Sequence, residues 1–257
     1  MKLTIEHLKA GYDSVVIIDD LSLAIPEGKI TALIGANGCG KSTLLKTICR
    51  IQPRLGGRVL LDGADVHEAD PRALAKSIAI LPQNPTAPEG LTVRELVSYG
   101  RAPYKTSFFS RTTAKDREMI DWALTETNMM EFQHRPIGAM SGGQRQRAWI
   151  AMAIAQDTEI LFLDEPTSFL DVAQHLNEAY GKTIVMVLHE LNQAARFAHC
   201  LVGMCCGQLL YCGTPEEVFH KEMLHRVFHI DAELMSDPRT GKPMCIPYCV
   251  NESEHSA

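Results

Sequence analysis

A glycine-rich segment that ends in a lysine and a serine is the part of the chain best suited to chemistry. It reads GANGCGKS over residues 35–42, after a strand pattern at 29–34 and before a helical pattern at 41–49. Glycines let successive backbone N–H groups turn towards an anion, and the amino end of the helix adds a positive dipole. The lysine of such a loop reaches the β- and γ-phosphates of a nucleotide, and the serine hydroxyl binds Mg²⁺. The segment predicts a site for ATP and Mg²⁺.

The alternative is a glycine-rich turn without a ligand, but the complete spacing and the flanking strand and helix favour a phosphate loop. The expected nucleotide contacts come from the loop and from the first turn of the helix. Within this set the lysine also supports catalysis, and the serine is a metal ligand. The set consists of Gly35, Asn37, Gly38, Cys39, Gly40, Lys41, Ser42 and Thr43.

Two carboxylates follow a second apolar strand pattern, ILFL at 160–163. Asp164 is suited to hold the shell of a magnesium ion, and Glu165 can act as the general base on an attacking water. The alternative is that the pair caps a helix, because Pro166 follows it. With a phosphate loop in the same chain, the pair favours hydrolysis of the bound nucleotide.

A third motif, SGGQ at 141–144, precedes a strongly periodic helical pattern at 142–156. A serine at the N-cap, two glycines and a helix amino end form another place where an anion can bind. One chain already has a phosphate loop, so a second phosphate cradle is redundant within it. The motif makes sense if Ser141, Gly142, Gly143 and Gln144 close on ATP held by another copy of the chain.

Strand and helix patterns alternate along the chain, and several strands are continuous apolar runs, as in an α/β sheet covered on both faces. The early strands and the pair around Gly207 look like antiparallel hairpins. Three helical stretches between 83 and 156 read as a helical lobe inserted between two sheet strands. The strands are expected at 3–8, 29–34, 59–61, 77–81, 160–163, 183–188, 201–205 and 208–212.

Composition narrows the class of protein. The 257 residues carry a formal net charge of −6 and no basic stripe, which argues against nucleic acid as a partner. No run approaches the roughly 20 apolar residues of a membrane-spanning helix, and the first residues lack a signal-peptide core, which favours the cytoplasm. The eight cysteines show no paired C-x-x-C motifs and are expected to be reduced thiols, with zinc or disulfides as the alternatives.

Six elements occur together in an order and spacing that resemble one family, the nucleotide-binding subunits of ATP-binding-cassette (ABC) transporters. The resemblance covers about residues 2–248. Lys41 and Ser141 are 100 residues apart, whereas chromosome-organising and DNA-repair ATPases separate these motifs by hundreds of residues. The elements are GANGCGKS, Gln83 after a strand, SGGQ, ILFLDEP, Leu170-Asp171 and His189.

The resemblance implies a single ABC ATPase domain over 1–257 with a P-loop NTPase (RecA-like) α/β fold. The core, with its mixed sheet and an antiparallel β subdomain, would span residues 1–83 and 157–257. The inserted helical subdomain, which holds the SGGQ signature motif, would span residues 84–156. It further implies a head-to-tail, ATP-dependent homodimer. In that dimer each ATP lies between the phosphate loop of one chain and the SGGQ motif of the other.

The resemblance also implies roles for single residues. Tyr12 matches an aromatic residue that stacks on adenine, unless it is a tyrosine packed in the sheet. Gln83 would touch Mg²⁺ and the attacking water, and Asp171 would lie at the dimer interface. His189 would contact the γ-phosphate and position the water; the alternative is a satisfied core histidine.

Within the family, four stretches are most similar to ATPases of iron–siderophore, haem and cobalamin importers. The similarity implies integral membrane permease subunits, an indirect link to a substrate-binding protein, and a peripheral location at the cytoplasmic face of the inner membrane. The first stretch would form the surface under a cytoplasmic helix of the permease. The stretches are 87–101, 141–168, 188–198 and 237–248.

Two departures from the family pattern bear on hydrolysis. Phe169 occupies a position that usually holds a small residue, so its ring would pack across the dimer or obstruct closure. After Asp171 only DVAQHLNEAYGK precedes Thr183, so about nine residues, or ~13 Å of helix, are missing relative to the family. We expect that helix to be repacked or largely lost. The alternatives to a transport ATPase are a catalytically weak ATP-binding switch and an ABC ATPase for translation or DNA repair.

Overall fold

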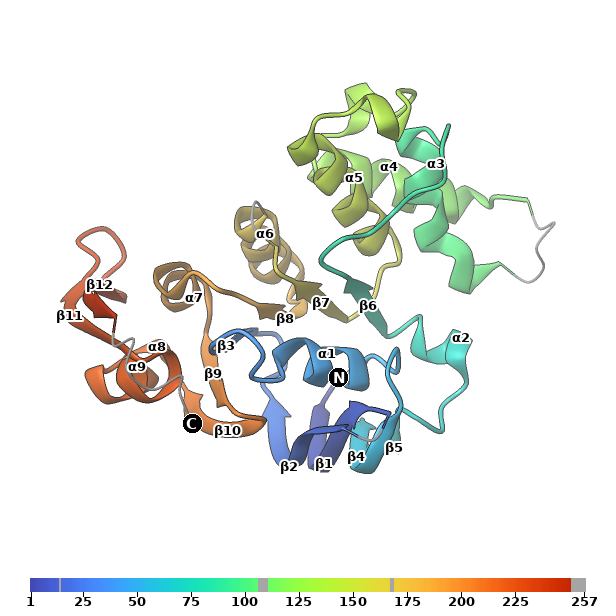
Figure 1. Cartoon of the computed structure of the whole chain (residues 1–257). Coiled ribbons are helices and arrows are strands. Elements are labelled where there is room, and N and C mark those ends of the chain that lie inside the picture. Colours follow the sequence, from blue (N-terminus) through green and yellow to red (C-terminus); the bar gives the residue numbers. More distant parts are fainter. Residues whose placement is uncertain (14, 106–110, 167–168, 251–257) are drawn as a thin grey trace. The chain divides into compact units, whose positions relative to one another are not determined.

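The computed structural model describes residues 1–13, 15–105, 111–166 and 169–250 (Figure 1). The chain divides into two compact units, and both mix helices with strands. The first unit combines Met1–Glu68 with Thr183–Ala257, and the second is Ala69–Lys182. The predicted α/β class is confirmed, whereas the predicted boundaries of the helical subdomain stay a prediction.

The first unit contains parallel strands that are buried along their whole length. Strand β3 lies between β8 and β9 and runs parallel to both, and β10 pairs antiparallel with β9. All five residues of β3 and of β8 are buried, as the continuous apolar runs predicted. These elements are β3 (Ile30–Ile34), β8 (Thr183–Val187), β9 (Cys200–Cys205), β10 (Gln208–Gly213), and the helices α1 (Lys41–Ile48) and α7 (Leu191–Phe197).

The same unit carries a separate antiparallel sheet in the order β2-β1-β4-β5, which agrees with the antiparallel β subdomain implied by the resemblance, although strands β2 and β5 were not predicted from the sequence. A further hairpin, β11–β12, packs against α7 and α9, and it was not predicted from the sequence. The elements are β1 (Leu3–Tyr12), β2 (Val15–Ile25), β4 (Arg54–Leu61), β5 (Ala64–Asp65), α8 (Pro215–Val218), α9 (Lys221–Phe228), β11 (Ile230–Ser236) and β12 (Pro243–Val250).

The second unit joins two parallel strands, β6 and β7, to a cluster of helices in which α3, α4 and α5 pack on one another. Three short 3₁₀ turns lie at Tyr99–Tyr104, Met130–Phe132 and Ile137–Ala139. The elements are α2 (Pro71–Leu74), β6 (Ile78–Leu81), α3 (Val93–Ser98), α4 (Ala114–Glu126), α5 (Gly142–Ala155), β7 (Ile160–Asp164) and α6 (Leu170–Tyr180).

A buried ion pair holds this helical cluster together. Arg101 Nε donates to Asp116 Oδ1 at 3.0 Å, and the two side chains are only 4% and 6% exposed. Arg101 Nη1 also donates to the backbone oxygen of Ala155 at 2.8 Å, at the end of α5. Burial alone would raise the pKa of Asp116, but hydrogen bonds from Thr113 and Arg101 outweigh it and hold that pKa below its ordinary value.

Replacing Arg101 by methionine is expected to lower the free energy of unfolding at pH 7 by about 3–5 kcal/mol, because it leaves the Asp116 carboxylate buried without its cation. The loss should shrink below about pH 4, since Asp116 becomes protonated and the wild type then loses the same stabilisation. Urea denaturation between pH 3 and pH 7 measures both effects. Arg117→Met, on the exposed face of α4, is the matched control, and an equal loss in both variants would contradict the assignment.

Helix α6 decides between the two expectations for the segment after Asp171, a repacked helix or a largely lost one. It is a continuous helix of 11 residues that buries Leu170, Ala173, Leu176 and Asn177, so the helix is not lost. It ends at Gly181, which has a φ of +65° and therefore allows the left-handed C-cap. The Phe169 side chain is 1% exposed, so the expectation that its ring projects into a dimer interface is wrong.

Polar and aromatic contacts tie the end of α6 to α4. The Tyr180 hydroxyl accepts a hydrogen bond from Trp122 Nε1 at 3.0 Å and donates one to Glu126 Oε1 at 2.9 Å. His175 Nε2 lies 2.9 Å from Glu126 Oε2. The Trp122 and Tyr180 rings also meet edge to face, with centroids 5.3 Å apart. The shortened helix is therefore packed against its own unit.

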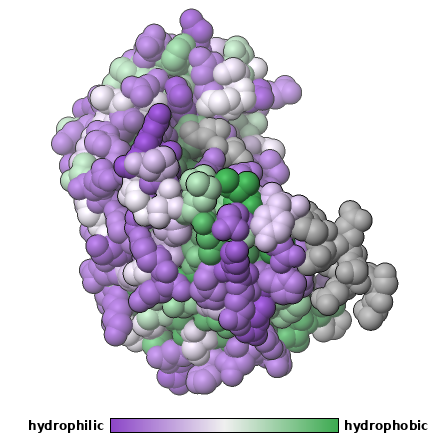
Figure 2. Space-filling model, turned by 90° about the vertical axis from the view of Figure 1, so that its left-hand side faces the viewer, coloured by the Kyte–Doolittle hydropathy of each residue, from purple (hydrophilic) through white to green (hydrophobic). Residues whose placement is uncertain are grey.

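Within the described residues, no helix is long and apolar enough to cross a lipid bilayer. Figure 2 looks onto the β11–β12 side of the molecule and shows a small hydrophobic area within a largely hydrophilic surface. The large hydrophobic residues that β11 and β12 expose are Met235, Ile246 and Tyr248.

Candidate nucleotide site

The predicted phosphate loop connects the buried strand β3 to the amino end of α1 (Figure 1). Gly40 is the N-cap of α1 in a left-handed conformation, with φ +103°. At Gly35 a Cβ atom would lie 2.3 Å from the Met204 backbone oxygen and 2.7 Å from Cys39 Sγ, so only glycine fits there. Asn37 and Gly38 are exposed at the tip of the loop. The glycines therefore form the open turn that the sequence predicted.

Lys41 lies inside this turn. Its Nζ donates to the backbone oxygens of Gly35 and Ala36 at 2.8 Å and 2.9 Å, and it is 3.6 Å from Cys39 Sγ. The residue is only 5% exposed. A buried ammonium held by loop carbonyls provides a strong positive charge where phosphates would bind. Ser42 and Thr43 follow it in the first turn of α1.

His189 lies at the same edge of the sheet as the phosphate loop. β3 and β8 are parallel neighbours, and the Leu188 backbone N–H donates to the Leu33 oxygen at 3.1 Å, so both segments follow the carboxyl ends of adjacent strands. His189 is exposed, which makes the alternative of a core histidine wrong. The carboxyl edge of parallel strands is where α/β folds bind ligands.

Tyr12 ends strand β1 and is 41% exposed, so the alternative of a tyrosine packed in the sheet is wrong. Val15 and Val16 begin the next strand and are exposed beside it, at 58% and 43%. This end of the β1–β2 hairpin therefore presents an aromatic ring and two apolar side chains to solvent. Such a surface suits the flat face of a nucleotide base.

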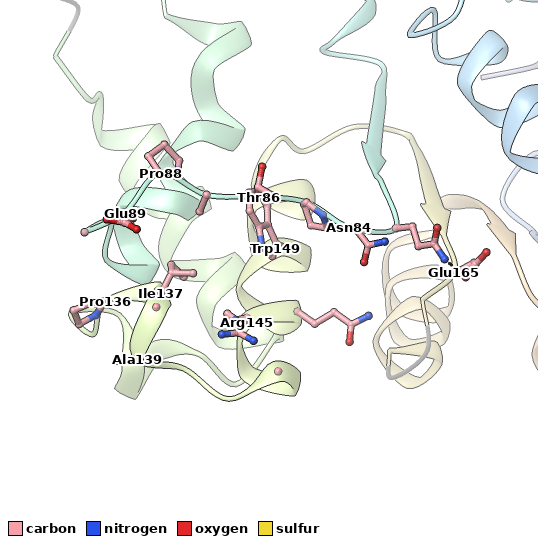
Figure 3. A pocket seen from close by; sticks show the side chains of 17 residues that line it. Asn84, Thr86, Pro88, Glu89, Pro136, Ile137, Ala139, Arg145, Trp149 and Glu165 are labelled. Atoms are coloured by element: carbon pink, nitrogen blue, oxygen red, sulfur yellow. Dashed lines mark hydrogen bonds between the residues drawn. The ribbon is translucent and has the colours of Figure 1, made fainter. Parts of the chain in front are cut away.

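In the second unit, the two carboxylates lie at the carboxyl end of β7, and Gln83 follows the carboxyl end of the parallel neighbour β6. The Gln83 side-chain amide donates a hydrogen bond to Glu165 Oε2, drawn as a dashed line in Figure 3. Asp164 is the buried last residue of β7. The fold thus brings Gln83, Asp164 and Glu165 together, although 81 residues separate the first two.

Glu165 has a backbone φ of +56°, a left-handed conformation that glycine adopts most easily. This conformation costs free energy in residues other than glycine and persists where the surrounding structure over-determines it. The N-cap of the next helix, α6, is Phe169. The alternative that the two carboxylates cap this helix is therefore wrong.

The SGGQ motif forms the amino end of α5. Ser141 Oγ accepts from the Gln144 backbone N–H at 3.3 Å, and Gln144 Oε1 accepts from the Ser141 N–H at 3.0 Å, a reciprocal capping box. A Cβ atom on Gly142 or Gly143 would meet nothing within 4 Å among the described residues. Ser141, Gly142 and Gly143 are exposed in the described part of the second unit.

A cavity of about 930 Å³ lies in the second unit between the segment 83–90 and the region 136–149. Arg145 and Trp149 project from α5 towards this segment, with Glu89 at one end of the cavity and Glu165 at the other (Figure 3). The predicted surface at 87–101 contributes part of the wall. Arg145, Trp149 and Glu89 lie in the stretches 87–101 and 141–168 that carry the resemblance, but sequence analysis gave none of them a role of its own.

The site residues divide between the two compact units. The loop from Gly35 to Thr43, Tyr12 and His189 belong to the first unit, and all others belong to the second. Asp171 is exposed in the first turn of α6. The β9–β10 hairpin around Gly207 was predicted from the sequence, but its contact with the phosphate loop was not: the Gly207 N–H donates to the Cys39 oxygen at 3.0 Å.

Comparison with known proteins gives a consistent result. The family model described as ABC transporter matches residues 18–168. The chain is 51% identical to the iron(3+)-hydroxamate import ATP-binding protein FhuC of Bacillus subtilis, over 98% of this chain and 97% of FhuC. It is 39% identical to the ferric enterobactin transport ATP-binding protein FepC of Escherichia coli, over 94% of this chain and 92% of FepC.

The alignment with FhuC extends over 261 residues, more than the 257 of this chain, so FhuC has residues that this chain lacks. An inward-facing ABC transporter of the metal-chelate type matches with a TM-score of 0.81 and 26% identity, over 96% of this chain and 97% of that one. The phosphate loop, the carboxylate pair and the capped SGGQ helix agree with these similarities. The chain belongs to the ABC transporter family and is an ATP-binding ATPase of that family.

Proposed function

We propose that this chain hydrolyses ATP to energise the import of ferric siderophores. The observation that carries the proposal is the meeting of Gln83 and Glu165 at the carboxyl ends of β6 and β7, in a chain with a complete phosphate loop. A carboxylate with a glutamine amide beside it can both activate and orient a water molecule. The similarity to FhuC over almost the whole length supports a ferric hydroxamate as the transported substrate.

The residues around the phosphate loop would bind the triphosphate. The backbone N–H groups from Gly35 to Thr43 would surround the β-phosphate, and Lys41 would exchange its two carbonyl partners for phosphate oxygens. Tyr12 would stack on adenine. The Ser42 hydroxyl, the Asp164 carboxylate and the Gln83 amide oxygen are hard oxygen donors that fit Mg²⁺. When bound, Mg²⁺ neutralises charge on the β- and γ-phosphate oxygens.

Hydrolysis would then depend on position and charge, with no covalent intermediate. Glu165 would accept a proton from the attacking water, and Gln83 would hold the Glu165 carboxylate in place. His189, at the edge shared with the phosphate loop, would contact the γ-phosphate. Lys41 would stabilise the charge that develops on the transferred group.

The exposed cradle formed by Ser141, Gly142, Gly143 and Gln144 supports a head-to-tail homodimer. Its N–H groups would bind the γ-phosphate of ATP held by the other copy, and Asp171 would lie at the interface between the copies. Each active site would therefore need two chains. Binding of ATP would close the dimer, and hydrolysis would open it.

The cavity in the second unit supports a permease as the membrane partner. Its walls combine the apolar surfaces of Trp149 and Ile137 with the charges of Arg145 and Glu89, a mixture typical of protein interfaces. A cytoplasmic segment of the permease would bind there, next to Gln83. The chain would then sit peripherally at the cytoplasmic face of the inner membrane, and a substrate-binding protein would deliver the chelate to the permease.

A second candidate, an ATP-binding switch with weak hydrolysis, is favoured by one observation. The helix after Asp171 has 11 residues, and the relative FhuC has residues that this chain lacks. If the shortened helix displaced Asp171 from the dimer interface, ATP would bind and the dimer would turn over slowly. The Glu165 variant described in the Discussion separates the two functions, because a switch has little turnover to lose.

Uptake by the source organism tests the proposal. We expect Ser141→Arg, introduced into the chromosomal gene, to lower uptake of iron-55 ferric hydroxamate by at least about 10-fold, since its bulk and charge block the shared phosphate cradle. Ser236→Arg, on the exposed end of β11, is the matched control and should retain uptake. Loss of uptake of haem or cobalamin alone would change the assigned substrate. Unchanged uptake of all three would overturn the proposal.

A further inference from the structure

Cysteines are concentrated in the β9–β10 hairpin. Four of the eight cysteines in the chain lie within residues 200–212. Strand β9 of this hairpin pairs with β3, the strand that precedes the phosphate loop. None of the four belongs to the nucleotide site described above. They are Cys200, Cys205, Cys206 and Cys212.

Cys200 and Cys212 face one another across the two strands. Their Sγ atoms are 4.0 Å apart, at hydrogen-bond distance for sulfur. Cys212 pairs with Val202, so Cys200 is its diagonal neighbour on the same face of the hairpin. Cys200 is 7% exposed, whereas Cys212 is exposed to solvent. One sulfur is therefore accessible to a small reagent, and the other lies directly behind it.

The contact between the sulfurs makes the two thiols chemically different. The hydrogen bond from Cys200 lowers the pKa of Cys212 to about 7, against the opposing effect of burial. The same hydrogen bond and the burial of Cys200 raise the pKa of the Cys200 thiol. Near neutral pH a large share of Cys212 is therefore thiolate, the nucleophilic form, while Cys200 keeps its proton.

We propose that Cys200 and Cys212 form an oxidisable dithiol site that reacts with hydroperoxides and is converted to a disulfide across the β9–β10 hairpin. The proposal rests on the facing sulfurs and on the exposure of one of them. It is independent of the proposed transport function.

The chemistry balances with a hydroperoxide as the two-electron oxidant. The Cys212 thiolate attacks the outer oxygen of the peroxide; an S–O bond forms, the O–O bond breaks, and the alkoxide leaves as the alcohol after taking a proton. The Cys200 sulfur then attacks Cys212 sulfur; the S–S bond forms, the S–O bond breaks, and hydroxide leaves as water with the Cys200 proton. Two thiols and one hydroperoxide thus give one disulfide, one alcohol and one water.

The adjacent pair Cys205–Cys206 provides a comparison within the same hairpin. Their sulfurs are closer, at 3.6 Å. Neighbouring Cα atoms are only about 3.8 Å apart, however, which is shorter than the roughly 4.4–6.8 Å that a relaxed disulfide spans. Cys200 and Cys212 lie on separate strands as diagonal neighbours, whose Cα atoms are typically about 7–8 Å apart, so a small approach of the two strands brings them within this range. We therefore expect the bridge to form between the strands and not in the turn.

The β9–β10 hairpin contacts the phosphate loop, so a disulfide within the hairpin can affect the nucleotide site. Its turn contacts the phosphate loop through the Gly207 N–H and the Cys39 oxygen, and Met204 oxygen lies against Gly35. A covalent bond between β9 and β10 reduces the number of conformations open to the hairpin. Oxidation should therefore slow backbone opening across 200–213, the segment behind the phosphate loop.

The test oxidises the full-length folded protein with hydrogen peroxide and then alkylates the remaining thiols before proteolysis. We expect mass spectrometry to find a Cys200–Cys212 linked peptide with a loss of about 2 Da, and hydrogen exchange across 200–213 to slow. In the reduced protein, iodoacetamide should modify Cys212 with a half-maximal rate near pH 7, against about pH 8.5 for an ordinary thiol. Loss of that shift in Cys200→Ala would confirm that Cys200 is its cause.

Variants separate the site from general thiol damage. Cys212→Ser should abolish the linked peptide, and Cys200→Ala should leave a Cys212 sulfenic acid that dimedone traps. Cys206→Ser, in the turn of the same hairpin, is the matched control and should still form the bridge. Two results would overturn the proposal. One is that most of the linked peptide comes from another pair of cysteines. The other is that the wild type loses no pair of thiols at a peroxide concentration that is high enough for dimedone to label Cys212 in Cys200→Ala.

Discussion

Replacing Glu165 by glutamine is expected to lower the steady-state rate of ATP hydrolysis by about 10²–10⁴-fold, the contribution of a well-placed general base. Glutamine keeps the size of the side chain but cannot accept the proton of the attacking water. It also retains a polar partner for Gln83, so the hydrogen bond between the ends of β6 and β7 can persist. Binding of ATP should stay within about 3-fold of the wild type, because the binding groups of the phosphate loop are intact. Phosphate release and equilibrium binding measure the two effects.

The control is Glu178→Gln, an exposed glutamate on α6 that accepts a hydrogen bond from Gln174, and its turnover should equal that of the wild type. In gel filtration with ATP and Mg²⁺, the Glu165 variant should accumulate as a dimer, since closure no longer ends in hydrolysis. A turnover rate that is unchanged from a measurable wild-type rate would remove Glu165 from the mechanism. A wild-type rate already as low as that of the variant would favour the ATP-binding switch.

Replacing Lys41 by alanine is expected to have the other large effect, a loss of ATP binding itself. The Lys41 ammonium is buried inside the phosphate loop, and charge-assisted hydrogen bonds of this kind contribute about 1.5–3 kcal/mol each. Two such bonds to phosphate oxygens would be lost. We therefore expect Kd for ATP to rise by at least about 100-fold, with turnover falling to background. Isothermal titration calorimetry with ATP gives the affinity directly.

Lys46→Ala is the matched control, because Lys46 lies on the same helix but outside the loop, and it should bind ATP normally. Circular dichroism should show that Lys41→Ala keeps the fold, since the loop carbonyls can bond to water once the ammonium is gone. An ATP affinity within about 2-fold of the wild type would show that Lys41 does not contact the phosphates.

The two variants also separate binding from catalysis in the shortened protein. If both behave as expected, the 11-residue helix α6 is sufficient for turnover. The packing of Tyr180 against Trp122 and Glu126 gives a physical reason, because it fixes the end of α6 against α4.

Local chemistry was predictable from the sequence because it depends on residues that are neighbours along the chain. The glycines of the phosphate loop, the capping box at Ser141 and the buried strands β3, β7 and β8 follow from backbone conformation and from continuous apolar runs. These features place Lys41 at a helix amino end and Glu165 after a strand. The sequence also indicated two families of strands, one parallel and one antiparallel.

Only the tertiary structure decided which distant residues meet. Gln83 reaches Glu165 because β6 and β7 are adjacent parallel strands, and the sequence does not state their order in the sheet. The burial of Phe169, the packing of Tyr180 on α4 and the facing sulfurs of Cys200 and Cys212 depend in the same way on neighbours far along the chain. The β11–β12 hairpin was missed because its exposed strands lack the apolar runs that marked the others. Periodicity and spacing report the conformation of one segment, whereas contacts between segments depend on the free energy of packing the whole chain.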